Sequence, residues 1–70
     1  MARHLTRFYA LEKGDVEYQH LGDIVGFIPN ISTLSIINVN GKGAYRINGM
    51  RTDIDLQDYF VIQSILMKAE

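Results

Sequence analysis

Residues 52–70 read TDIDLQDYFVIQSILMKAE, and the fold predicted for the chain depends on the conformation of this stretch. Thr52 is a favourable helix cap, and Asp55 stands three residues further on, as in a weak form of the capping box. Apolar residues then recur at helical spacing in one broad stripe, formed by Ile54, Val61, Ile62, Ile65 and Ala69. The stretch therefore predicts a C-terminal α-helix over about residues 53–69.

A second apolar stripe lies on the same predicted helix. At about 100° per residue, Leu56, Phe60 and Met67 cluster away from the first stripe. One sheet covers one side of a helix, so the second stripe either packs inside the chain or faces a second copy. Burial of each such side chain is worth about 1.5–3 kcal/mol, whereas so small a core supplies only about 3–5 kcal/mol in total. We therefore expect a homodimer built partly on Leu56, Phe60 and Met67.

The remaining sequence is typical of strands joined by tight turns. Turns are expected at Gly14, at Asn40-Gly41 and at Asn48-Gly49, because glycine and Asn-Gly adopt the left-handed angles of hairpins. Residues 21–28 are compatible with a strand or a short helix, although two glycines disfavour the helix. The predicted strands cover about residues 4–11, 15–28, 33–39 and 44–50. The predicted fold class is α+β: a small antiparallel sheet of about four hairpin-connected strands with one C-terminal helix packed on it.

Length and composition bound the classes of protein to consider. Seventy residues allow a single domain, residues 1–70, and 47% hydrophobic content is typical of a folded chain. The absence of cysteine excludes disulfides and thiolate metal sites. No apolar run approaches the roughly 20 residues that span a bilayer, and the first residues do not resemble an export signal. We therefore expect a cytoplasmic protein that does not enter a membrane.

The formal net charge of −1 conceals a separation of charge into blocks. Residues 12–23 and 53–58 are acidic, whereas residues 42–51 are basic. A row of acidic side chains can imitate the backbone of a nucleic acid and occupy the groove of a basic DNA-binding protein. The residues predicted to form this acidic surface are Glu12, Asp15, Glu17, Asp23, Asp53, Asp55 and Asp58.

Two alternatives remain open at this point. The chain is also compatible with a nucleic-acid-binding module in which cations grip phosphates and a tyrosine stacks on a base. The residues available for that role are Arg3, Arg7, Lys42, Tyr45, Arg46 and Arg51. A structural subunit that only assembles with itself is the second alternative.

The sequence contains no arrangement typical of a catalytic or metal site. None of the three serines lies in a nucleophile elbow, and His4 and His20 lack the partners and spacing of metal ligands, even with Asp23 added. We therefore predict no catalytic residue, no metal and no cofactor. The predicted function is that of a small, non-enzymatic, protein-binding regulator or inhibitor that acts as a homodimer, as accessory proteins of a host or a phage often do.

Overall fold

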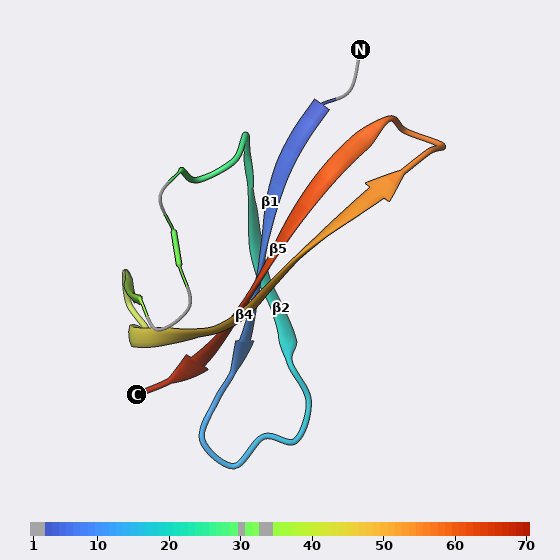
Figure 1. Ribbon diagram of the computed structural model, residues 1–70. Helices are drawn as coiled ribbons and strands as arrows, with labels where there is room; N and C mark the ends of the chain where they lie inside the picture. Colours follow the sequence, from blue (N-terminus) through green and yellow to red (C-terminus); the bar gives the residue numbers. More distant parts are fainter. Residues whose placement is uncertain (1–2, 30, 33–34) are drawn as a thin grey trace.

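The described part of the computed structural model, residues 3–29, 31–32 and 35–70, forms one five-stranded β-sheet (Figure 1). The strands are β1 (Arg3–Leu11), β2 (Gln19–Val25), β3 (Ile36–Val39), β4 (Gly43–Asp55) and β5 (Phe60–Ala69). They lie in the order β2-β1-β5-β4-β3, and only β1 and β5 are parallel neighbours. The sheet curls into a half-barrel, which has a concave inner face and a convex outer face.

The prediction of an α+β fold with a C-terminal helix is wrong, because none of the described residues is helical. Residues 52–55 end β4, residues 56–59 form a turn, and the rest belongs to β5. Successive side chains of a strand point to opposite faces, and the central strand β5 carries apolar residues on both: Val61, Ile65 and Met67 on the inner face, and Ile62 and Leu66 on the outer face. Such a central strand has a nearly continuous apolar run, which is why the segment gives two stripes when it is projected on a helix. The described residues include no helix that is long and apolar enough to cross a membrane.

The second apolar stripe is therefore not a surface of a helix. Met67 is completely buried in the core, whereas Leu56 lies in the turn after β4 and is 78% exposed. Phe60 is the first residue of β5 and is half-buried. The expected interface of Leu56, Phe60 and Met67 on one helical face does not form, because the three side chains lie in three different environments.

Local polar residues organise the turns of this sheet. Asp55, which the sequence suggests as part of a capping box, instead accepts hydrogen bonds from the backbone N–H groups of Gln57 (2.9 Å) and Asp58 (3.3 Å). Gly41 has a φ of 81° in the turn between β3 and β4, as expected for Asn-Gly. Asn48-Gly49 does not reverse the chain: it forms a bulge in the pairing of β4 with β5, so that β4 continues to Asp55.

The core occupies the inner face at one half of the sheet. Its fully buried hydrophobic residues are Ala10, Tyr45, Ile47, Ile65 and Met67. Ile28 and Ile31, from the connection between β2 and β3, pack against this cluster. Of the predicted strand over residues 33–39, residues 33 and 34 lie outside the described residues, and the described strand begins at Ile36. The core is thus one layer of side chains covered by a loop.

The core predicts a clear contrast between two isoleucines of the β4–β5 hairpin. Ile65 has no exposed surface, whereas Ile54 is 67% exposed. We expect Ile65→Val to lower the free energy of unfolding by about 0.5–1.5 kcal/mol, because it leaves a methyl-sized cavity in a packed core. The matched change Ile54→Val should alter it by less than about 0.5 kcal/mol. Urea unfolding followed by circular dichroism measures both, and equal losses would contradict the assignment of the core.

Candidate functional site

Four arginines of the predicted nucleic-acid-binding set share the outer face of the sheet. Arg7 of β1 and Arg51 of β4 are both in register with Ser64 of β5, one on each side of it. Arg3 and Arg46 lie on the same face, in register with other outward-facing residues of β5. The structure therefore places on one face cations that are up to 48 positions apart in the sequence, and it brings Arg7 and Arg51 closest to each other in register.

Carboxylates accompany three of these arginines. The ion pairs are Arg7–Asp23 (3.1 Å), Arg46–Glu70 (2.7 Å) and Arg51–Asp53 (3.3 Å). All of these side chains are partly exposed, so each pair stabilises the fold by no more than about 1 kcal/mol. Their main effect is to cancel most of the positive charge of the outer face.

Tyr45 and Lys42, the other two members of that set, lie elsewhere. Tyr45 is 1% exposed, and its hydroxyl donates a hydrogen bond to the Glu12 carboxylate. This hydrogen bond, together with burial, raises the pKa of the Tyr45 hydroxyl above its ordinary value. A ring in this position is part of the core and does not stack on a base. Lys42 is exposed in the turn between β3 and β4.

Two other tyrosines, which the sequence reasoning did not select, lie on the outer face. Tyr9 and Tyr18 line a hollow of about 350 Å³ together with Arg51, Asp53, Ser64 and Leu66. The amide of Asn48 donates a hydrogen bond to the Tyr18 hydroxyl (2.8 Å). Strand alternation was the available signal for Tyr9, because residues two apart on β1, such as Arg7 and Tyr9, share a face.

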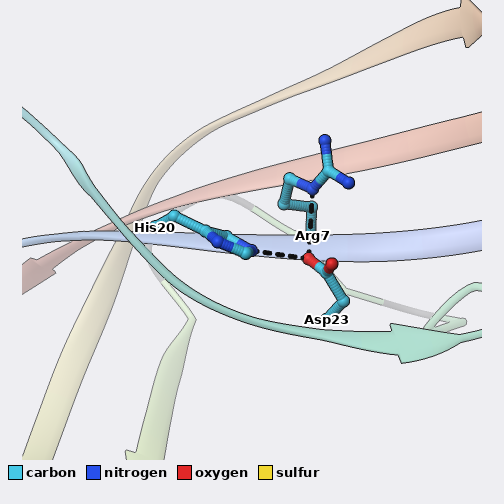
Figure 2. A network of polar contacts seen from close by, with 3 residues as sticks. All are labelled: Arg7, His20 and Asp23. Atoms are coloured by element: carbon cyan, nitrogen blue, oxygen red, sulfur yellow. Dashed lines mark hydrogen bonds and ion pairs between the residues drawn. The ribbon is translucent and has the colours of Figure 1, made fainter.

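Asp23 is the centre of the polar network on this face (Figure 2). Figure 2 shows its carboxylate between Arg7 of β1 and His20 of β2. Oδ1 of Asp23 accepts a hydrogen bond from Nε of Arg7 (3.1 Å) and lies 2.8 Å from Nε2 of His20. The contact with His20, followed by that with Arg7, lowers the pKa of Asp23 against the opposing effect of burial. The same carboxylate raises the pKa of Arg7.

The acidic residues do not form one surface. Because β1 and β5 are parallel, the loop that follows β1 and the turn that precedes β5 lie at opposite ends of the sheet. Glu12, Asp15 and Glu17 belong to that loop, and Asp53, Asp55 and Asp58 belong to or adjoin that turn, whereas Asp23 lies between the two groups on the outer face. Several of these carboxylates accept hydrogen bonds from backbone N–H groups close to them in the sequence. For example, Asp15 accepts one from the N–H of Glu12 (3.2 Å).

The two histidines lie on opposite faces of the sheet. His4 points to the inner face, where its ring is 4.6 Å from that of Phe27. His20 is on the outer face beside Asp23. Within the described ranges, no three histidine, cysteine, aspartate or glutamate side chains gather closely enough to hold a metal ion.

An apolar cleft opens between the two edge strands of the half-barrel. Its volume is about 370 Å³, and it leads from the surface to the core residue Met67. Strand β2 forms one wall and β3 with the following turn forms the other. The apolar lining consists of Phe8, Leu21, Ile24, Ile37, Val39 and Met67. In the described part of the chain, β2 pairs only with β1 and β3 pairs only with β4, so the backbone edges that flank the cleft have no strand neighbour.

Comparisons with protein families, with curated proteins and with solved structures find no match to this chain.

The network around Asp23 predicts a dependence of stability on pH. Its pKa in the folded chain is below the ordinary 3.8, so the ionised carboxylate stabilises the fold above about pH 4. This contribution is lost as the pH falls through the lowered folded-state pKa. We expect the loss of unfolding free energy between about pH 5 and pH 2.5 to be smaller in Asp23→Asn than in the wild type.

Urea unfolding at the two pH values, with a carboxyl NMR titration of Asp23, measures the effect. Asp58→Asn, outside the network, is the control and should keep the wild-type dependence. A pKa of Asp23 at or above 3.8 would contradict the interpretation.

Proposed function

We propose that this chain is a non-enzymatic protein-binding domain, and that the cleft between β2 and β3 receives an extended segment of a partner protein. One observation carries the proposal: in the part of the chain that the structure describes, β2 and β3 each have one backbone edge without a strand neighbour, and they flank an apolar cleft of about 370 Å³ that leads to the core. Binding sites in proteins are mostly apolar concavities of about 300–1,000 Å³ with few polar groups. The cleft matches this description.

The edge strands favour a peptide segment as the occupant. An extended segment pairs its backbone with an unpaired strand and inserts alternate side chains into pockets, which is the basis of β-strand addition. β2 offers seven residues for such pairing, whereas β3 offers four. We infer that the partner segment adds antiparallel to β2 and directs every second side chain toward Phe8, Leu21 and Ile37.

The lining of the cleft supports binding rather than catalysis. Asp23 is its one titratable residue, and that carboxylate already contacts Arg7 and His20. A general base needs a free position within hydrogen-bond reach of the substrate proton. The remaining lining residues are apolar side chains, a glycine and two asparagines. We therefore propose no reaction for this site.

Recognition of a basic partner by an acidic surface has less support. The acidic residues are divided between two ends of the sheet, and the longest dimension of the molecule is 38 Å. Charges separated by more than about 8 Å are largely screened at physiological salt. The two groups of acids would therefore act independently and not as one continuous row.

Single-stranded nucleic acid on the outer face is a second candidate function. The observation in its favour is that Tyr9 and Tyr18 line one hollow with Arg51, and that Arg7 lies across Ser64 from Arg51. Aromatic rings beside cations are typical of platforms for unpaired bases. The neighbouring carboxylates of Asp23 and Asp53 reduce the attraction for phosphate, so this candidate ranks below peptide binding.

A displayed library of random heptapeptides tests the first proposal. We expect the wild-type protein to enrich peptides with alternating apolar residues. A synthetic peptide of the enriched sequence should shift the amide NMR signals of β2 and β3. Ile24→Lys places a charge in the cleft and on the edge of β2, and should weaken binding at least about tenfold, or 1.4 kcal/mol. Ile24 is 45% exposed, so this variant should fold.

Val16→Lys, at a 95% exposed position in the loop after β1, is the control and should bind like the wild type. Failure to enrich any peptide, or equal binding by Ile24→Lys, would overturn the proposal. An oligonucleotide of unpaired thymidines is tested in parallel. Its binding, together with loss of binding in Arg51→Ala, would favour the second candidate instead.

A further inference from the structure

Exposed apolar side chains gather at one end of the sheet. This is the end where β1 and β5 begin and β2 and β4 finish, in the upper part of Figure 1. We call it the apolar end and define it by Val25, Phe27, Ile54, Leu56, Tyr59 and Phe60. Five of these six are among the nine large hydrophobic residues that are exposed in the described part of the chain. Val25 is 91% exposed and Leu56 is 78% exposed.

These residues lie at the same end of the sheet but not on one face: Val25 and Phe60 are on the outer face and Phe27 and Ile54 on the inner face, whereas Leu56 and Tyr59 belong to the turn between β4 and β5. Phe60 is in register with Arg3, and the N–H of Arg3 donates a hydrogen bond to the carbonyl oxygen of Tyr59 (2.8 Å). An adjoining hollow of about 460 Å³ is lined by Arg3, His4, Val25, Gly26 and Phe60. The turn of the β4–β5 hairpin thus lies beside the start of β1, which in turn pairs with the end of β2.

Tyr59 adds an independent observation. It has a φ of 57° and is the only described residue other than glycine with a positive φ. A bulky residue in this left-handed region is uncommon, because its Cβ crowds the backbone, and glycine is the usual choice. The strained backbone holds the tyrosine ring at the tip of the hairpin, where the side chain is 66% exposed. Strain of this kind clusters at binding sites.

We propose that the apolar end is the interface through which two copies of this chain form a symmetric dimer. A two-fold interface is made by the same patch on both copies, so it must complement itself. On the outer face the apolar end does so: Arg3 of β1 and Asp55 of β4 are in register with Phe60 from its two sides, so a copy rotated about Phe60 brings its Asp55 opposite Arg3.

The apolar surface that the fold leaves exposed also favours a second copy. A typical stable interface covers about 800 Å² on each partner, which is roughly one sixth of the 5069 Å² surface of this chain. Among the described residues five hydrophobic side chains are buried, which is a small core, so a second copy covers apolar surface that the fold itself leaves in water. Two of the three residues that the sequence predicts for a dimer interface, Leu56 and Phe60, therefore belong to the proposed interface. The third, Met67, is buried in the core and takes no part.

Sedimentation equilibrium from about 1 to 300 μM tests the proposal on the intact chain. We expect the wild type to be dimeric at the upper concentrations. Leu56→Lys should weaken the dimer at least about tenfold, because it places a charge in an apolar contact. Tyr59→Gly should weaken it by a similar factor while the domain folds at least as well, since glycine relieves the positive φ. A loss of the dimer in this variant is therefore not a loss of folding.

The matched control is again Val16→Lys, which changes an exposed apolar residue in the loop after β1, at the other end of the sheet. It should dimerise like the wild type. A wild-type monomer at every concentration would overturn the proposal, as would unchanged dimerisation of both Leu56→Lys and Tyr59→Gly. Equal weakening by Val16→Lys would also overturn it, because the interface would then not be confined to the apolar end.

Discussion

The parallel pairing of β1 with β5 is the constraint on which the rest of the structure depends. Nine consecutive residues of each strand are in register, from Arg3 with Phe60 to Leu11 with Lys68. Parallel neighbours need a long connection between them, and here that connection contains the three other strands. The first and the last strand of the described chain therefore lie side by side in the middle of the sheet, and β2 and β3 become its edges.

This arrangement explains why so much apolar surface stays uncovered. A single curled sheet has one concave face, and its core is closed by the loop that carries Ile28 and Ile31. β3 has four residues and pairs only with the first part of β4, so the second half of the β4–β5 hairpin extends beyond it. The open cleft lies beside the short edge strand, and the apolar end lies at the tip of the long hairpin. The part of the apolar end that belongs to the β4–β5 hairpin follows from this mismatch in strand length.

Local signals in the sequence predict two of the three expected turns correctly, whereas the turn expected at Asn48-Gly49 is a bulge within β4. Gly14 and Gly41 have the positive φ that hairpin turns require, and both fall where the sequence predicts a turn. Residues 53–69 carry helical spacing, acidic residues at the start and no breaker, and yet they form the end of β4, a turn and β5. The deciding contacts are non-local, as between Thr6 and Gln63, which are 57 residues apart. Periodicity within a segment contains no information about such a neighbour.

In the candidate site, too, the sequence predicts which residues of one strand share a face but not which strands are neighbours. Alternation along one strand suffices to place Arg7 beside Tyr9 on a face, and the charge blocks are real features of the sequence. Whether two blocks meet depends on the direction of pairing, which the sequence does not reveal. An antiparallel neighbour would bring the loop after β1 close to the turn before β5, whereas the parallel register places them at opposite ends.

The parallel direction of β5 therefore determines that the two groups of acidic residues act separately. With the two acidic groups apart on a molecule 38 Å long, screening limits each to its own neighbourhood. In the dimer that we propose, Asp55 at the apolar end faces Arg3 of the second copy. Charges at the rim of an apolar contact contribute mainly to the selection and orientation of the partner. The net charge of −1 is thus the sum of several local patterns, each belonging to a separate surface.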